Sequence, residues 1–160
     1  MFNLDNNKII KTDLPIITHN RVNILEEDLP ILFYGNNRYG NIILGSIINE
    51  DISNNDYFFF HLIIDIETFY NYLNKKISYY QILENSDTIF IIKQKYNGDI
   101  GDIYAYSFNC IPQEYLPFRD TFCPDYEPYK LNNVINVQIN IADLYKKLSS
   151  VGSKLQEEYS

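Results

Sequence analysis

The sequence predicts an α+β fold: a mainly antiparallel, twisted sheet of five to seven strands, two short helices after the central strand, and a C-terminal helix. Apolar segments of strand length alternate with polar turns containing glycine and asparagine, and tight turns join antiparallel strands. One apolar segment, residues 57–64, runs directly into two separately capped helical segments. A stripe of apolar residues along 141–155 predicts the last helix.

The first hairpin is predicted over residues 29–48. Residues 29–34 read as a strand, because Pro30 is followed by Ile-Leu-Phe-Tyr. Residues 35–40 contain the glycine and asparagine that supply positive φ angles in turns. Residues 41–48 are again apolar and return as the partner strand.

The segment 57–64 is predicted to be a central strand covered on both faces. Successive side chains of a strand point to opposite faces, and here both sets are large and mainly apolar. His61 lies within this strand. Because no acid or nucleophile motif accompanies it, we interpret His61 as a packed, hydrogen-bonded residue of the sheet rather than a catalytic base.

Two short helices are predicted directly after the central strand. Asp65 is placed to cap the first one. Its apolar residues follow the spacing of one helix face and are Ile66, Phe69, Tyr70 and Leu73. Ser78 begins the second helix and forms a capping box with Gln81, three residues later.

Strand character resumes over residues 88–95. The turn 97–102 then leads into 103–108 and predicts a second hairpin. Residues 134–139 alternate apolar and polar side chains and predict one more strand. Asn140 is placed to cap the C-terminal helix.

Two segments carry weaker patterns. Residues 1–20 predict either an edge strand or a loose arm, and Pro15 argues against a central strand. Regular structure should lapse over residues 111–129, because four prolines interrupt both helix and inner strand. These prolines are Pro112, Pro117, Pro124 and Pro128.

Length and composition favour a single domain, residues 1–160. The chain is 46% hydrophobic and 21% charged, which is enough apolar surface for a sizeable core. The longest apolar run is too short to span a bilayer, and the N-terminus lacks the pattern of a signal peptide. We therefore expect a cytoplasmic protein with no membrane partner, in which Cys110 and Cys123 are reduced thiols.

The charge of the chain argues against a nucleic-acid partner. The formal net charge is −8, and the excess of acidic side chains is spread over both halves of the sequence. Binding to a phosphate backbone needs clustered lysine and arginine, which this sequence lacks. An acidic balance either keeps a protein soluble or favours a basic protein partner.

Motifs with a known catalytic mechanism are absent from the sequence, including phosphate-binding loops, zinc-protease motifs and nucleophile elbows. His19 and His61 are the two histidines, and they are far apart in the sequence. The turn 98–102 holds two carboxylates between glycines, which is more typical of a hairpin turn than of a cation site. We predict no catalytic residues, no metal ligands and no cofactor, and a non-catalytic protein is favoured over an enzyme.

The proline-rich segment is the candidate partner-binding site, because aromatic and acidic side chains alternate along it. A loop of this kind either covers its own sheet or presents aromatic anchors to a partner, with carboxylates that orient a basic surface. The candidate residues are Tyr115, Phe118, Phe122, Tyr126, Tyr129, Glu114, Asp120 and Asp125.

An alternative is a binding domain for a small, nucleotide-like ligand, or an enzyme of a type not yet described. Its pocket would lie between the sheet and the helices, lined by tyrosines and His61. For the oligomeric state, the sequence leaves a monomer or a homodimer open, since the stripe of the C-terminal helix could dock on the sheet or pair with a second copy.

Three segments between residues 29 and 117 carry a recognisable pattern. They are Pro30-Ile31-Leu32-Phe33, Lys76-Ile77-Ser78 followed by Tyr79-Tyr80-Gln81-Ile82-Leu83, and Ile111-Pro112-Gln113-Glu114-Tyr115-Leu116-Pro117. They resemble the "PLLF" hairpin strand, the "GKISLRDLL"-like helix start and the "LPxDYLP"-like segment of a family of small bacterial proteins of unknown function.

The sequence departs from the family at two places. Lys75 stands where the family often has glycine, and Tyr80-Gln81 stand where it often has Arg-Asp. Gln81 still closes the predicted capping box. The resemblance implies a bacterial or phage-borne cytoplasmic domain and carries over no catalytic residue.

These observations together favour an acidic, non-catalytic interaction protein of a bacterium or its phage. Its work would be to present aromatic and carboxylate side chains to a protein partner. A defence, counter-defence or toxin-neutralising system is the setting we expect.

Overall fold

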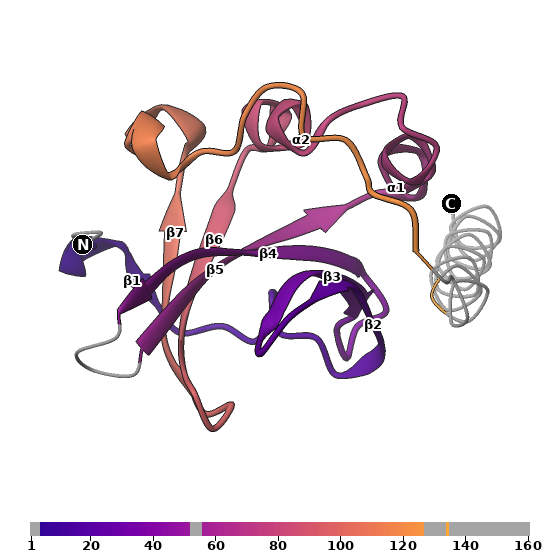
Figure 1. The fold of residues 1–160 in the computed structure, drawn as a ribbon. Helices are drawn as coiled ribbons and strands as arrows, with labels where there is room; N and C mark the ends of the chain where they lie inside the picture. The colour runs from indigo at the N-terminus through magenta and orange to yellow at the C-terminus, as the bar shows by residue number, and fades with distance from the viewer. Residues whose placement is uncertain (1–3, 52–55, 127–133, 135–160) are drawn as a thin grey trace, which may run out of the picture.

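The computed structural model describes residues 4–51, 56–126 and 134. Within them the chain forms a seven-stranded antiparallel sheet with two helices on one face, an α+β fold (Figure 1). The strands are β1 Ile9–Ile10, β2 His19–Glu26, β3 Pro30–Asn36, β4 Ile42–Asp51, β5 Asp56–Ile64, β6 Ile89–Lys95 and β7 Ile100–Tyr106. The helices are α1 Ile66–Leu73 and α2 Tyr79–Asn85, and single 3-10 turns are η1 Asn6–Lys8, η2 Phe108–Cys110 and η3 Gln113–Tyr115.

The sheet is a meander from β2 to β7, and β5 lies at its centre. The order across the sheet is β1-β7-β6-β5-β4-β3-β2. In β5, Phe60 pairs with Ser46 of β4 and with Ile91 of β6. The predicted central strand and both predicted hairpins are therefore confirmed.

Alternation along β5 builds two apolar layers. Phe58, Phe60 and Leu62 belong to the large core beneath the helices, together with Phe69 of α1 and Leu83 of α2. On the other face, Tyr57 and Phe59 pack with Phe33 of β3 in a second cluster. Strand β5 is covered on both faces over most of its length, as the sequence predicted, and Ile63 is its one exposed residue.

The caps predicted for α1 and α2 are both present. The Asp65 side chain accepts a hydrogen bond from the Thr68 backbone N–H at 2.7 Å. Ser78 and Gln81 form the reciprocal capping box, with distances of 3.2 and 2.8 Å. These bonds satisfy backbone donors that a helix N-terminus would otherwise leave unpaired.

The N-terminal arm, residues 11–18, crosses the second face of the sheet from one edge to the other (Figure 1). Before it, β1 forms a short edge strand against β7, with Ile9 opposite Tyr104. Within it, Pro15 is buried and Ile16 and Ile17 pack against the apolar clusters of this face. Of the two expectations for residues 1–20, the edge strand is the one observed for residues 9–10.

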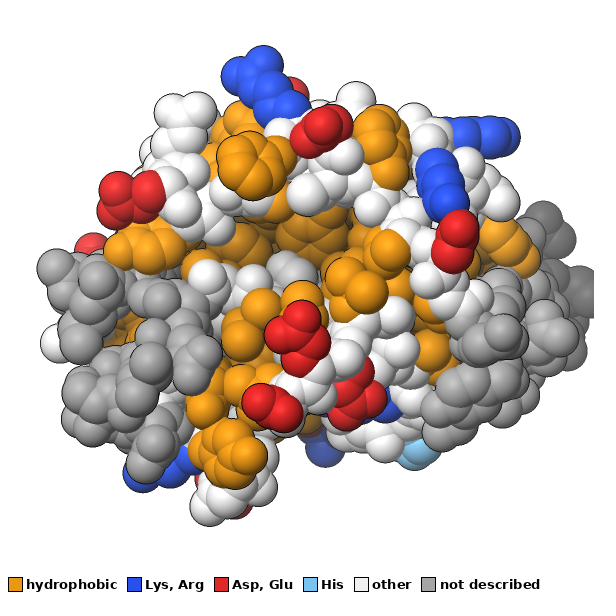
Figure 2. Space-filling view, viewed as in Figure 1, with side chains coloured by type: hydrophobic (Ala, Val, Ile, Leu, Met, Phe, Trp, Pro, Cys, Tyr) orange, Lys and Arg blue, Asp and Glu red, His pale blue; other side chains and the backbone are white. Residues whose placement is uncertain are grey.

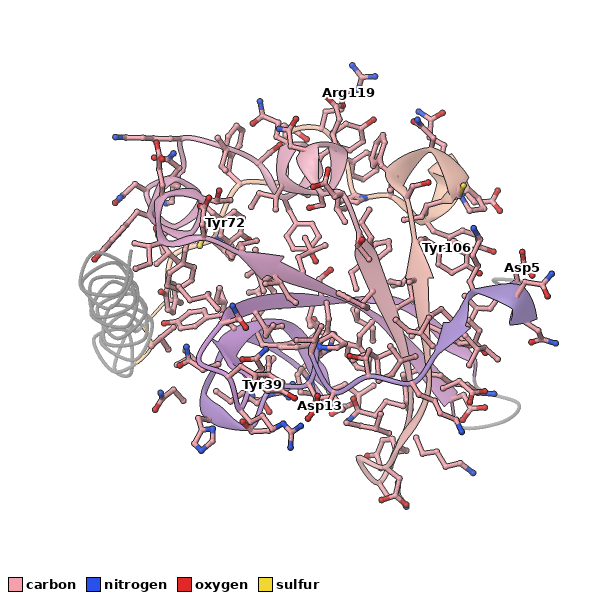
Figure 3. All side chains as sticks on the ribbon, turned by 180° about the vertical axis from the view of Figure 1, so that it is seen from behind. Asp5, Asp13, Tyr39, Tyr72, Tyr106 and Arg119 are labelled. Atoms are coloured by element: carbon pink, nitrogen blue, oxygen red, sulfur yellow. The ribbon has the colours of Figure 1, made fainter. Side chains whose placement is uncertain are left out.

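The arm is also held by side chains near the β3–β4 turn. The Asn37 amide donates to the Leu14 carbonyl at 2.8 Å. The Tyr39 hydroxyl donates to the Asp13 carboxylate at 3.1 Å, and Figure 3 shows these two labelled side chains next to each other. Arg38 forms an ion pair with the same carboxylate.

Strand β2 was not predicted from the sequence. The sequence predicted no strand over residues 21–26, whereas β2 runs to Glu26. Its pairing with β3 is interrupted by three register shifts, and Asn20 has a positive φ of 57°. Such irregularities break the period of two on which strand prediction depends.

The remaining predictions of secondary structure concern the C-terminal part. The strand 134–139, the helix from Asn140 and the candidate residue Tyr129 lie outside the described residues, apart from Val134. Val134 is buried and helical, so the start of a strand at this residue is wrong. Along the part of the chain that the structure describes, no helix is long and apolar enough to cross a bilayer.

Candidate interaction site

The aromatic loop, residues 111–126, passes over α2 and then α1 (Figure 1, orange). Its regular structure is limited to η3, as the spacing of the prolines predicted. One backbone bond attaches the loop to α2: the Tyr79 N–H donates to the Thr121 carbonyl at 2.8 Å. The first N–H groups of a helix have no partner inside the helix, so this bond satisfies one of them.

Part of the loop packs inward and closes the core beneath the helices. Cys123 is 2% exposed and belongs to the large core. Tyr115 and Tyr126 are half-buried against the same cluster. The Tyr126 hydroxyl lies 3.1 Å from the hydroxyl of Tyr34 on β3. For Tyr115 and Tyr126, covering the protein's own core is the observed role.

The tip of the loop points the other way. Phe118 is 83% exposed and Phe122 is 45% exposed. A turn holds this tip, because the Thr121 N–H donates to the Phe118 carbonyl at 3.2 Å and the Phe122 N–H donates to the Asp120 carbonyl at 2.9 Å. The Thr121 hydroxyl donates to the same Phe118 carbonyl. Of the five aromatic candidates, Tyr115 and Tyr126 pack inward, Phe118 and Phe122 point outward, and Tyr129 lies outside the described residues.

Charges of both signs surround the two exposed phenylalanines. Glu114 and Asp120 are exposed. Asp125 forms an ion pair with Lys75, whose ammonium group lowers the pKa of the Asp125 carboxyl. Arg119, which is not among the residues predicted from the sequence, lies over the Tyr80 ring at 5.4 Å and points away from the molecule above α2 (Figure 3). Figure 2 shows acidic, basic and hydrophobic side chains side by side along the upper edge, where α2 and the loop lie.

The Cys123 thiol is enclosed and poorly reactive. Burial raises its pKa to about 11, against the smaller lowering effect of Lys75. Burial also raises the pKa of the Tyr72 hydroxyl, which lies against Cys123. Figure 3 shows Tyr72 beneath α1, pointing toward the core. A thiol of raised pKa gives little thiolate at neutral pH, so Cys123 is a packing residue.

His61 lies on the face of the sheet away from the helices. Its ring packs edge-on against Phe33 at 5.4 Å, and its Nδ1 lies 2.7 Å from the Pro15 carbonyl. A carbonyl can only accept, so Nδ1 carries the proton and donates to it. The predicted pocket of tyrosines and His61 between sheet and helices is therefore wrong for His61, because neighbouring β5 side chains alternate between faces.

Burial makes His61 a poor proton acceptor. The side chain is 5% exposed, and burial lowers its pKa to about 4. Within the described residues its Nε2 has no hydrogen-bond partner. A neutral, enclosed imidazole that holds the arm agrees with the interpretation of His61 as a packed residue.

A hollow of about 480 Å³ lies between α1, α2 and the end of β5. Asp65, Gln81 and Asp87 are among its lining residues. The Asp65 carboxylate and the Gln81 side-chain amide already accept hydrogen bonds in the two helix caps, so few polar groups of the hollow remain available to a ligand. Over the described ranges, no group of three or more His, Cys, Asp or Glu side chains is placed to hold a metal ion.

Comparison with known proteins finds no match to this chain among protein-family models, curated proteins or solved structures. Function is therefore inferred from the geometry of the chain itself. Its most distinctive element is the aromatic loop, which is attached at both sides of its tip and exposes two phenylalanines there.

Proposed function

We propose that this chain is a non-catalytic interaction protein that binds a protein partner through Phe118 and Phe122. The exposure of Phe118, at 83%, is the observation that carries the proposal. Burying a phenylalanine side chain stabilises a protein or a complex by about 1.5–3 kcal/mol. In the free protein the Phe118 side chain is exposed and does not contribute this free energy, whereas its burial against a partner would stabilise the complex.

Attachment of the loop supports the same role. Tyr115 and Leu116 pack against the core before the exposed tip, the Tyr79–Thr121 backbone bond holds the tip itself, and the buried Cys123 holds the chain after it. A loop already held in one conformation loses less conformational freedom when it binds. Aromatic side chains presented in this way are the usual energetic centres of protein interfaces.

The partner we propose has an apolar pocket for Phe118 and basic groups at its rim. Glu114 and Asp120 flank the tip without an ion pair among the described residues, whereas Asp125 is paired with Lys75. The net charge of −8 would favour encounter with a basic surface over a long range. Arg119 lies beside the tip, so the partner surface should also offer an acidic or aromatic side chain to contact its guanidinium group.

We propose that the protein belongs to a bacterium or its phage and works in the bacterial cytoplasm. Its role there would be in defence, counter-defence or toxin neutralisation. It rests on the resemblance to a family of small bacterial proteins. One structural detail supports that resemblance: Lys75, where the family often has glycine, has a φ of +60° just after α1. Glycine adopts this conformation more readily than other residues and is common at this helix position.

The test is quantitative affinity capture from lysate of the native host. Wild-type protein and the variants Phe118→Ala, Phe122→Ala and Tyr70→Ala would be compared. Tyr70 on α1 is the matched control, since its exposure of 41% is close to that of Phe122. We expect captured partner to fall at least about tenfold for Phe118→Ala, in keeping with a hot-spot residue, and to stay unchanged for Tyr70→Ala.

Thermal unfolding of the same variants separates an interface from a lid. An 83% exposed side chain contributes little to the core, so Phe118→Ala should leave the melting temperature unchanged. Unchanged capture together with a lowered melting temperature would show that the tip covers the core instead. Capture of no reproducible partner by the wild type would also contradict the proposal.

A further inference from the structure

The N-terminal arm leaves one end of the second sheet face uncovered. At that end a hollow of about 340 Å³ lies between the β2–β3 turn and the tip of the β6–β7 hairpin. The hairpin tip projects beyond the sheet at the bottom of Figure 1. We name this feature the Arg21 hollow. Its lining includes Arg21, Asp28, Leu29, Tyr57, Tyr96 and Lys95.

Aromatic side chains form one wall of the Arg21 hollow. The rings of Tyr57 on β5 and Tyr96 on the hairpin lie 6.0 Å apart, tilted by 42°. Phe59 of β5 also lines the hollow and is buried. Tyr96 is 62% exposed, so its ring faces solvent over much of its area. Exposed tyrosine rings are suited to stack on a planar ligand while their hydroxyls remain solvated.

Arg21 supplies a cation that is only partly satisfied. Its guanidinium lies over the Phe33 ring at 4.1 Å, and Nε donates to the Asn23 side chain at 3.3 Å. Among the described residues no carboxylate lies within ion-pair distance of it. Burial lowers the pKa of Arg21, and Glu26 only partly offsets this. A half-buried, unpaired charge is costly, and an anion placed beside it would remove part of that cost.

Two further charged groups make the hollow selective. Lys95 adds a second cation at the mouth, where it is exposed. Asp28 is the carboxylate of the lining and can accept hydrogen bonds from an amine or hydroxyl. A ligand that suits all of these groups has a planar ring, an anionic group and a hydrogen-bond donor.

We propose that the Arg21 hollow is a binding site for small molecules of the mononucleotide class, independent of the aromatic loop. The phosphate lies against Arg21 and Lys95, the base stacks on Tyr96, and Asp28 accepts from a sugar hydroxyl or a base amine. The volume of about 340 Å³ falls within the range of about 300–1,000 Å³ that small-molecule sites have.

The experiment is calorimetric titration of the full chain with adenosine 5′-monophosphate, with adenosine and inorganic phosphate as the two partial ligands. We expect a dissociation constant of about 0.5 mM for the nucleotide and binding at least about tenfold weaker for each partial ligand. At about 5 mM nucleotide the melting temperature should rise by about 3 °C.

Two variants and two matched controls locate the site. Arg21→Gln removes the cation, and Tyr96→Ala removes an exposed ring that the fold does not need. Arg38→Gln and Tyr39→Ala alter an arginine and a tyrosine that do not line the hollow, where the Arg38 guanidinium lies 4.7 Å from the centre of the Tyr39 ring. We expect at least about tenfold weaker nucleotide binding for each of the first two variants and wild-type binding for the controls.

Three results would overturn the proposal. The first is the absence of saturable binding of the nucleotide to the wild type. The second is equal affinity for inorganic phosphate, which would reduce the hollow to a plain anion site. The third is wild-type affinity in Tyr96→Ala and Arg21→Gln. Phe118→Ala should bind the nucleotide normally, so this test and that of the aromatic loop fail or succeed separately.

Discussion

The imidazole of His61 links the stability of this protein to pH. Its pKa is about 4 in the folded chain, below the ordinary value of 6.5. Between these two values the unfolded chain binds a proton that the folded chain does not. Stability from this group is therefore complete above pH 6.5 and is lost as the pH falls toward 4.

We predict that His61 alone makes the folded state less stable by about 3 kcal/mol at pH 4 than at pH 7, since each unit of pKa shift corresponds to about 1.4 kcal/mol. Urea unfolding at several pH values measures it. His61→Asn keeps an amide N–H for the Pro15 carbonyl and should flatten the pH dependence by this amount. The same replacement at His19, which is exposed, is the control. The prediction would be contradicted if the free energy of unfolding changed equally with pH in the wild type and in His61→Asn.

The sequence indicated which single residues are buried only where apolar and polar side chains repeat with the period of a strand or a helix. His61 was placed within a packed strand because β5 alternates two large apolar sets. Phe118 and Tyr126 look equivalent in the sequence, yet the first is 83% exposed and the second contacts Tyr34. The prolines around them remove any period, so inward and outward positions cannot be told apart without the tertiary contacts.

At the scale of elements, the helices begin where short polar motifs predict them. Ser78 is fully buried, and its hydroxyl accepts from the Gln81 N–H while the Gln81 side chain accepts from the Ser78 N–H. The next residue, Tyr79, bonds to Thr121 of the aromatic loop. The cap of α2 therefore also positions the loop.

We predict that Ser78→Ala destabilises the protein by about 1–2 kcal/mol, the usual effect of removing an N-cap side chain. Denaturant unfolding measures it. Ser107 is a matched control, because it precedes η2 without making a side-chain cap bond and is exposed. A loss from Ser107→Ala as large as that from Ser78→Ala would show that the capping box is not the cause.

Strand β2 shows why one element was not predicted. Its residues mix polar and apolar side chains, and its bulges shift the register against β3. The strand exists because β3 offers it an edge and because the arm leads the chain there. Both causes involve residues distant in sequence, whereas the hairpins of β3–β4 and β6–β7 are specified by their own turns.

At the scale of the whole molecule, the sheet combines local and distant pairings. From β2 to β7 each strand pairs with its neighbour in sequence, with two helices inserted between β5 and β6. By contrast, β1 pairs with β7, bringing Ile9 to Tyr104. Hydrogen bonds at the sheet centre are covered on both faces, whereas β1 contributes two residues at an edge.

We predict a gradient of amide hydrogen exchange across the sheet. Amides of β5 should exchange slowest, near the limit of global unfolding, and the β1 amides should exchange fastest among the strands, through local opening. Exchange measured by NMR or mass spectrometry tests this order. Protection of β1 equal to that of β5 would show instead that the arm and the sheet open as one cooperative unit.

The difference between the two thiols has a practical consequence. Cys110 is exposed at the end of η2, whereas Cys123 is 2% exposed with a pKa of about 11. A maleimide dye reacts with accessible thiolate and will couple to Cys110 while Cys123 stays unmodified. The natural chain thus accepts a single fluorophore directly before the aromatic loop, where its emission can report binding of a partner without any engineered cysteine.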